Sequence, residues 1–367
     1  MTTDQPQELR TPPSSEADRC IKRRRVLDIL DTAGADSLLL SSQTALSWYL
    51  DGSRVHISLA ADPVAALLVD RNGDHLVTYN NEAERLASEE IPSGVSVLQV
   101  PWYGNLHDVE SWFGAPSGPA PLTEQAVARQ LRDARRSLLP AETERYARLC
   151  RDAAAALTDV LAAATPRTTE RQIAARLAER VVSAGADPLV LLCNGDSRVS
   201  YRHPLPTEAP LGRRAMAVVC ARRDGMIANV TRWVRFGEAG SAESDAEARI
   251  AAVESDLLRA TVPGARLNEI LAELGAAYLR HGFGADQWRL HHQGGTAGYA
   301  GRDPRATEST DDRVVVNQAF TWNPSGPGVK IEDTMLLTAS GMKPLTADDR
   351  WPTALVDGLA RPVTLEL

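Results

Sequence analysis

The sequence "HHQGGTAGYAGRDP", residues 291–304, is the most informative stretch of the chain. It joins two adjacent histidines to a run with four glycines and ends in charged residues. Histidines beside a glycine-rich backbone favour a metal site or a catalytic site, but their spacing raises the question whether a ligand is missing. Successive side chains of the strand that we expect here point to opposite faces. Only one of His291 and His292 should therefore face a pocket.

Around this stretch, residues 119–367 show helical and strand patterns without a strict β-α-β rhythm, which predicts an α+β domain. Thr169 and Gln172 form the Thr-x-x-Gln signature of a capping box and place a helix start there. Asp224-Gly225, between two apolar runs, predicts a hairpin turn. The expected helices span 142–164, 169–185, 243–262 and 265–282, and the expected strands span 188–193, 215–237, 314–324 and 329–338.

Residues 22–118 predict a separate α/β amino-terminal domain. The run 22–34 has the apolar spacing of a helix, and Asn72-Gly73 between two apolar runs predicts a hairpin. A Gly/Pro-rich connector, 113–124, follows this domain. The other expected strands span 37–40, 57–62 and 95–100.

The composition excludes several classes of protein. A chain of 367 residues fits two domains, and a net charge of −8 argues against nucleic-acid and anionic-membrane partners. No apolar run approaches the length of about 18 residues that a membrane span needs. Residues 1–21 are polar and predict a disordered tail, not a signal peptide, so we expect a cytoplasmic protein. The four cysteines are scattered and favour reduced thiols.

Five segments of the second domain, in this order, resemble the pita-bread family, which includes creatinase, prolidase, aminopeptidase P and methionine aminopeptidase. The first domain is also similar to the creatinase and prolidase amino-terminal domain, through "GADSLLLSSQTALSWYLDG". The resemblance implies an α/β two-domain protein, with a creatinase-like α/β amino-terminal domain followed by an α+β pita-bread domain. The five segments are "NGDSRVSYRHPLP", "DGMIANVTRWVRFG", "HHQGGTAGYAGRDP", "AFTWNP" and "VKIEDTMLLTASGMKPLT".

Metallopeptidases of this family hold two metal ions with two Asp, one His and two Glu. The resemblance aligns these ligand positions with Val218, Asn229, Gly295, Asn323 and Glu332. Valine and glycine offer no side-chain donor, and two asparagines with one carboxylate do not balance two divalent ions. A shifted alignment brings in Cys220 or Asp224, but not five ligands. We therefore expect no metal and no other cofactor, with the histidine ligand lost at Gly295.

Creatinase, which hydrolyses a C–N bond without metal, is the member that the remaining residues resemble. Its working histidine matches His203 in "SYRHPLP", and one of its carboxylates matches Glu332. Its other carboxylate position holds Thr231, which makes creatine a poor candidate substrate. The resemblance implies that His203 is the acid and base, that Glu332 anchors charge, and that His291 is a further catalytic residue.

Several other residues allow both a functional and a structural interpretation. Arg302, where the metallopeptidases have a second histidine, binds a substrate carboxylate or pairs with Asp303. The amides at the former ligand positions either supply neutral hydrogen bonds or have no function. The candidate substrate-binding residues are Arg302, Asn229, Thr231, Asn323 and Tyr299. A structural role is the stronger expectation for Arg232, Asp333, Trp233 and Trp322.

Three functions remain open at this point. The first is a metal-independent, creatinase-like enzyme acting on a C–N bond of a small guanidino, ureido, amide or peptide-like substrate. The same acid and base also serve a lyase, a cyclase or an isomerase. The second is a non-catalytic pseudo-peptidase that binds a peptide or a protein, and the third is a peptidase with unusual ligands. The pair His203 and Glu332 favours the first function, because a binding module has no need of both.

Two further expectations concern the setting of the protein. A chain rich in Arg and Ala, with lysine only at positions 22, 330 and 343, suits a tailoring enzyme of specialised, antibiotic-type metabolism. The resemblance also implies a homodimer. In such a dimer the neighbour's amino-terminal domain contributes to the pocket rim, here around Trp48, Tyr49 and Arg54.

Overall fold

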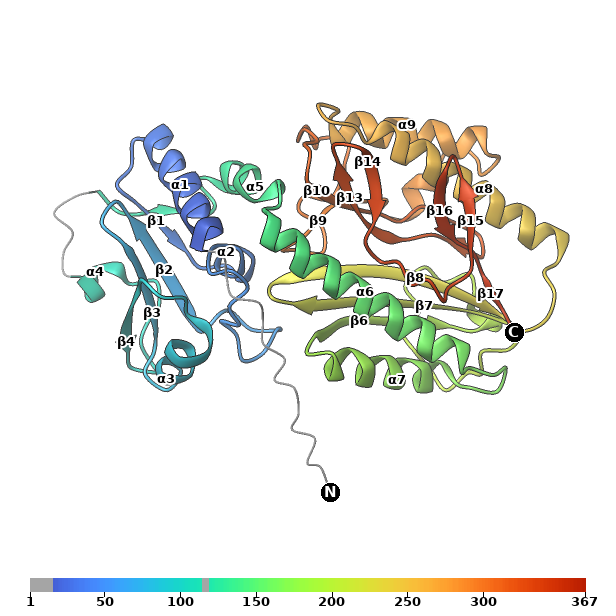
Figure 1. The fold of residues 1–367 in the computed structure, drawn as a ribbon, viewed down its shortest axis with the longest axis horizontal. Helices are drawn as coiled ribbons and strands as arrows, with labels where there is room; N and C mark the ends of the chain where they lie inside the picture. The colour runs from blue at the N-terminus through green and yellow to red at the C-terminus, as the bar shows by residue number, and fades with distance from the viewer. Residues whose placement is uncertain (1–15, 114–118) are drawn as a thin grey trace, which may run out of the picture. The chain divides into compact units, whose positions relative to one another are not determined.

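The computed structural model describes residues 16–113 and 119–367, and its ribbon is drawn in Figure 1. The backbone divides into two compact units. The first unit contains the described residues up to Ala134 and Pro140–Arg145, and the second contains Arg135–Leu139 and Tyr146–Leu367. The division differs from the predicted boundary at residue 118, because strand β5 (Leu122–Thr123) pairs with β1 (Ser37–Leu40) of the first unit.

The first unit is built on a five-stranded sheet with the strand order β4-β3-β2-β1-β5. Strands β2 (Ala65–Asp70) and β3 (Asp74–Tyr79) form the hairpin that the sequence predicted. The Asp70 carboxylate holds its turn by accepting hydrogen bonds from the backbone N–H groups of Asn72 and Gly73, at 2.6 and 2.8 Å. The other elements are β4 (Val95–Val100), α1 (Glu16–Ala33), α2 (Gln43–Tyr49), α3 (Ala83–Arg85), η1 (Leu86–Glu90), α4 (Val109–Phe113) and α5 (Ala128–Arg136).

Two predictions for this unit were wrong. Residues 57–62 form no strand, because the side chains of Ile57 and Leu59 are exposed and no neighbouring strand pairs with them. Helix α1 begins at Glu16, so residues 16–21 are helical and not part of a disordered tail; the remainder of the predicted tail lies outside the described residues. The predicted connector 113–124 also falls in part on residues 114–118, which lie outside the described residues.

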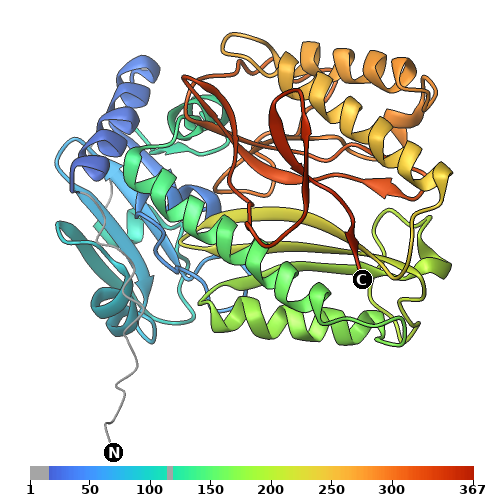
Figure 2. The same ribbon diagram turned by 45° about the vertical axis from the view of Figure 1, so that its right-hand side comes forward.

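The second unit contains two four-stranded sheets with helices on their outer faces (Figures 1 and 2). One sheet has the order β17-β8-β7-β6, and helices α6 and α7 lie along it; the other has the order β14-β13-β10-β9, with α8 and α9 beside it. The first sheet and its helices are β6 (Asp187–Asn194), β7 (Arg214–Arg223), β8 (Met226–Arg235), β17 (Leu365–Glu366), α6 (Pro140–Ala162) and α7 (Glu170–Ser183). The second group is β9 (Gly294–Ala297), β10 (Gln318–Trp322), β13 (Asp333–Thr338), β14 (Gly341–Pro344), α8 (Ser241–Ala260) and α9 (Leu267–Arg280). Two short hairpins are β11 (Ser325–Gly326) with β12 (Val329–Lys330) and β15 (Thr353–Val356) with β16 (Leu359–Pro362).

The expected helices and strands of this unit are confirmed, with ends that differ by a few residues. Thr169 and Gln172 form the predicted reciprocal capping box at the start of α7. The β7–β8 hairpin turns at Asp224 and Gly225, which both have positive φ angles, of 51° and 76°. An asparagine, an aspartate or a glycine is needed at such positions, because other side chains strain there.

The two sheets meet where β8 passes β13. The backbone N–H of Thr231 donates to the carbonyl oxygen of Glu332 at 3.0 Å. The Thr334 hydroxyl accepts from the N–H of Asn229 at 2.9 Å and donates to its carbonyl oxygen at 3.0 Å. These bonds fix the residues of β8 against the segment that carries Glu332, and so bring two distant sequence motifs together.

Apolar packing holds the helices to the second sheet. Leu274 and Tyr278 of α9 are buried in one cluster with Phe320 and Trp322 of β10. The indole of Trp322 stacks on Phe320 with the ring centroids 6.1 Å apart, which supports the structural role expected for Trp322. Among the described residues, no helix is both long and apolar enough to cross a membrane.

A buried ion network ties the carboxyl-terminal hairpin to α8. Arg361 of β16 donates two hydrogen bonds to the Glu254 carboxylate, at 2.7 and 2.6 Å, and one to Asp333 at 2.7 Å. Arg232 lies 2.9 Å from the other Asp333 oxygen. Asp333 and Arg232 thus have the structural positions that the sequence led us to expect.

We predict that Arg361→Met lowers the free energy of unfolding by about 3–5 kcal/mol, because it leaves buried carboxylates without their bidentate partner. The control is Arg171→Met, because the side chains of Arg171 and its partner Glu208 are 65% and 69% exposed; that change should cost about 1 kcal/mol or less. Urea unfolding of both variants measures the difference, and equal losses would show that the network does not stabilise the unit.

Candidate functional site

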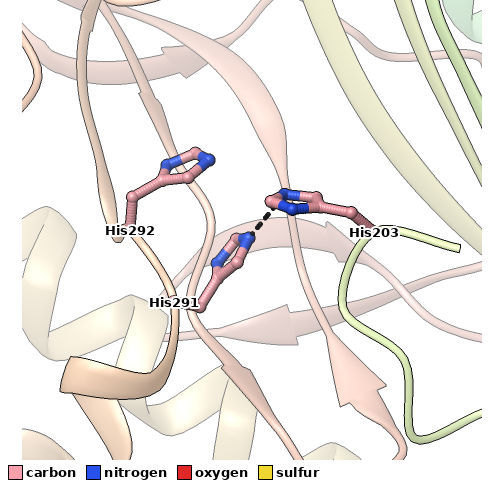
Figure 3. Close-up of side chains that lie close together, drawn as sticks. All are labelled: His203, His291 and His292. Atoms are coloured by element: carbon pink, nitrogen blue, oxygen red, sulfur yellow. Dashed lines mark hydrogen bonds between the residues drawn. The ribbon is translucent and has the colours of Figure 1, made fainter.

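Three histidines, His203, His291 and His292, form what we call the histidine cluster (Figure 3). His203 lies in the loop between β6 and β7, while the other two lie between η3 (Gln287–Leu290) and β9. The Nε2 atoms of His203 and His291 are 3.0 Å apart, a hydrogen-bond distance. The structure therefore brings together two histidines that the sequence identified as catalytic candidates.

The prediction that His291 and His292 point to opposite faces was wrong. Their rings stack, with centroids 4.4 Å apart and an interplanar angle of 28°. The strand alternation does not apply, because β9 begins only at Gly294. The bend before β9 is held by Gln293, whose amide nitrogen donates to the carbonyl oxygens of Trp288 and His291 at 2.8 and 2.7 Å.

Glu332 is held between two cations, and we call Glu332, Lys330 and Arg302 the Glu332 triad. Lys330 Nζ lies 2.8 Å from one carboxylate oxygen, and Arg302 Nη2 lies 2.8 Å from the other. The Thr231 hydroxyl donates a further hydrogen bond at 2.7 Å. Burial by itself raises the pKa of Glu332, but Lys330 and Arg302 outweigh this and hold the pKa far below its ordinary value. The carboxylate is therefore ionised, and the triad carries one net positive charge.

Lys330 was missed by sequence reasoning, although a signal was present. It is one of three lysines in the chain and lies two residues before Glu332 in an apolar, strand-like run. Side chains at this spacing share a face when the run is extended. His292 was missed for a different reason, since the expected strand pointed it away from its neighbour.

The histidine cluster lies in an environment that disfavours protonation. Burial and the nearby Lys330 charge lower the pKa of His203. Burial and the same charge lower the pKa of His291 to about 2, and burial together with Arg302 lowers the pKa of His292 to about 4. The three imidazoles are therefore uncharged at pH 7, each with one donor and one acceptor nitrogen.

The other predicted substrate-binding residues, besides Thr231 and Arg302, are Asn229, Asn323 and Tyr299, and all three are buried. Asn229, buried on β8 two residues before Thr231, faces the same side of the sheet and donates to the carbonyl oxygen of Ile227 at 3.3 Å. Asn323 is buried, and its Oδ1 has no hydrogen-bond partner among the described residues. Tyr299 is buried in the turn after β9, and its role in the pocket stays a prediction. Trp233 Nε1 donates to the Lys330 carbonyl oxygen at 2.9 Å, a structural contact.

Arg302 does not pair with Asp303. Asp303 instead receives both ends of the Arg135 guanidinium, while Arg302 donates to Glu332. The Nε of Arg302 is buried and has no hydrogen-bond partner among the described residues. The prediction that a structural Arg302 pairs with Asp303 was therefore wrong, because Arg302 pairs with Glu332. The Nε of its guanidinium remains available for a further hydrogen bond.

The five positions of the family's metal ligands do not fit two divalent ions. Both Glu332 oxygens are engaged by protein cations, which would repel a metal ion at the same place. A side chain at Gly295 has no room, since a Cβ there would lie 2.5 Å from the Pro304 carbonyl oxygen. Val218 lies opposite Thr231 in the β7–β8 ladder and offers no donor. Burial raises the pKa of Cys220 to about 12, so the thiol is protonated in the absence of a metal ion.

The comparisons with known proteins agree with this fold. Residues 144–339 match the model of the metallopeptidase family M24. The prolidase from Pyrococcus horikoshii OT3 is 17% identical, covers 90% of this chain and 99% of its own, and has a TM-score of 0.73. The Xaa-Pro dipeptidase from Bacillus anthracis is 14% identical, covers 95% and 100%, and has a TM-score of 0.72.

A third solved structure is the N-terminal domain of the FACT complex subunit SPT16 from Cicer arietinum, the chickpea. It is 11% identical, covers 90% of this chain and 95% of its own, and has a TM-score of 0.64. No curated protein matches the chain. At these identities the likeness shows the fold alone, and the predicted two-domain pita-bread fold is confirmed.

We predict that the protein, purified mildly without added metal and without a chelator, carries no dinuclear metal centre. The expectation follows from the occupied Glu332 oxygens and the closed backbone at Gly295. Elemental analysis per chain gives the measurement, with an M24 prolidase treated in parallel as the control. Two retained equivalents of manganese, iron, cobalt or zinc would contradict the prediction.

Proposed function

Because the chain belongs to the metallopeptidase family M24 and its residues do not fit the family's two metal ions, we propose that it hydrolyses a C–N bond without that metal centre. One observation carries this proposal, the 3.0 Å contact between the Nε2 atoms of His203 and His291 beside the buried Glu332 triad. The two histidines supply a pair of groups for proton transfer, and the triad supplies a separate positive charge. Both are needed for hydrolysis when no metal activates the water.

The proposed proton path uses both nitrogens of His203. When His203 Nε2–H donates to His291 Nε2, the Nδ1 of His203 carries the lone pair and can take a proton from water. The water oxygen forms the new C–O bond, the C–N bond breaks, and His203 returns the proton to the leaving nitrogen. His291 is then a positioning residue, which accepts the hydrogen bond that orients the base.

The Glu332 triad favours an anionic group on the substrate. A guanidinium would need a free carboxylate, but both Glu332 oxygens already bind protein cations. A substrate carboxylate, or the oxyanion that forms during attack, would be stabilised by the net positive charge and by the unpartnered Nε of Arg302. Among the candidate substrate classes, this favours an amide or peptide-like compound with a carboxylate over a guanidino or ureido compound. Glu332 would then hold Lys330 and Arg302 in place and not bind the substrate itself.

Two alternatives use the same site. The proton path also serves an elimination, a cyclisation or an isomerisation in a tailoring step of specialised metabolism. A non-catalytic role in binding a peptide or protein is supported by the internal pairing of all three triad charges. The chickpea domain of similar fold is described as part of a subunit of a complex.

We predict that the chelator-treated protein releases amine or ammonia from a member of a panel of N-acyl amino acids, dipeptides, ureido acids and guanidino acids. His203→Ala should lower turnover by about 10²–10⁴-fold, the usual contribution of a general acid and base. The control is His107→Ala, which changes an exposed histidine of the first unit. Turnover that survives in His203→Ala would refute the proton path, and wild-type protein inactive on the whole panel would favour the binding role.

We also propose that the chain forms a homodimer, as the resemblance to two-domain pita-bread enzymes implies. Trp48 and Tyr49 are buried in the first unit and cannot line a neighbour's pocket, whereas the Arg54 side chain is 64% exposed. Sedimentation velocity at micromolar concentration should give the mass of two chains. A single species with the mass of one chain, 39.7 kDa, would contradict the proposal.

A further inference from the structure

We propose that the histidine cluster binds a single divalent cation of borderline character, such as Zn²⁺, through one nitrogen of each of its three imidazoles. The potential ligand atoms of His203, His291 and His292 all lie within 4.8 Å of one another. Figure 3 shows the three rings converging from two segments that are far apart in the sequence. Imidazole nitrogens are preferred ligands of Zn²⁺, Cu²⁺, Ni²⁺ and Co²⁺.

The spacing of the nitrogens is close to what such an ion requires. With metal–nitrogen bonds of about 2.0–2.1 Å, two ligands of a tetrahedral ion lie about 3.4 Å apart. The Nε2 atoms of His203 and His291 are already 3.0 Å apart, so a small outward movement lets both face one ion. The half-buried His292 completes the set by a side-chain rotation, and a fourth position stays open for water.

Unsatisfied nitrogens inside the cluster give a second, independent observation. The Nδ1 atoms of both His291 and His292 are buried and have no hydrogen-bond partner among the described residues. Buried polar atoms are nearly always satisfied, so two neighbouring exceptions indicate a further bound species, an ion or a water molecule. His203 and His291 would bind the ion through Nε2, and His292 can use its unpartnered Nδ1.

This site differs from the dinuclear centre of the family. It uses none of the five ligand positions at Val218, Asn229, Gly295, Asn323 and Glu332. It also includes His292, which no family motif identified. The proposal does not depend on the proposed hydrolysis, since it concerns binding and not turnover.

Nearby charges should weaken the binding without preventing it. Lys330 and Arg302 act on the cluster as positive charges and Glu332 as a negative one. Lys330 and Arg302 are paired with Glu332 and together leave about one positive charge, and Arg305 adds to the repulsion at His203 and His292. Removing the Lys330 charge should therefore tighten metal binding, an effect that adventitious binding to surface histidines would not show.

The test titrates Co²⁺ into chelator-treated, tag-free protein and follows both visible absorption and calorimetric heat. We expect one equivalent per chain, with the intense visible bands of a tetrahedral ion, and displacement of the Co²⁺ by one equivalent of Zn²⁺. X-ray absorption of the Zn²⁺-loaded wild-type protein should count three imidazole ligands, a readout that needs no variant.

Variants then locate the site. His203→Ala, His291→Ala and His292→Ala should each weaken Co²⁺ binding at least tenfold and lose the tetrahedral bands, whereas His107→Ala should keep both. Lys330→Gln should lower the Kd several-fold. The proposal is overturned by no binding, by binding that survives all three alanine changes, or by fewer than three imidazoles around zinc. None of these results affects the substrate panel, so the two proposals fail separately.

Discussion

The buried charge of Glu332 is the constraint on which the site depends. An ionised carboxylate that is 3% exposed is very costly unless opposite charges compensate it. Lys330 from the same segment and Arg302 from the loop after β9 supply that compensation, and Thr231 adds a hydrogen bond from β8. The carboxylate therefore binds groups from three segments of the second unit, namely its own segment, the loop after β9 and strand β8. These contacts lie next to the histidine cluster.

Close backbone packing explains why positions 294 and 295 of the glycine-rich stretch hold glycines. A Cβ at Gly294 would lie 2.1 Å from the Thr321 carbonyl oxygen, and one at Gly295 would lie 2.5 Å from the Pro304 carbonyl oxygen. Both glycines also have positive φ angles, of 105° and 146°. β9 therefore packs against its neighbours backbone to backbone, and a histidine cannot return to position 295 without displacing the chain.

Local patterns in the sequence predicted the elements, and the order of five motifs predicted the fold. The capping box at Thr169, the hairpin at Asp224, the helix at residues 22–34 and the helices of the second unit follow from rules that act within a few residues. The expectation that the metal ligands are missing also came from the sequence, because it needs only residue types at positions matched by the resemblance, and it stays a prediction. Lys330 and His292 were not found, because their roles depend on contacts with residues that are distant in the sequence or on where a strand begins. The stacking of His292 on its neighbour follows from a bend before Gly294 that no local pattern indicates.

A metal ion in a hydrolase does two things, since it stabilises negative charge and lowers the pKa of water. A lysine and an arginine can take over the first task but not the second. Under the proposed mechanism the two tasks are divided in this chain, with charge at the Glu332 triad and proton transfer at the histidine cluster. The histidine cluster then has two proposed uses, proton transfer and cation binding, and they are incompatible because they need different tautomers of His203. Proton transfer needs the hydrogen on Nε2 and the lone pair on Nδ1, whereas an ion bound between the Nε2 atoms needs the reverse. A cation at the cluster would therefore block the base, so that the metal ion, which activates water in the family, would here act as an inhibitor.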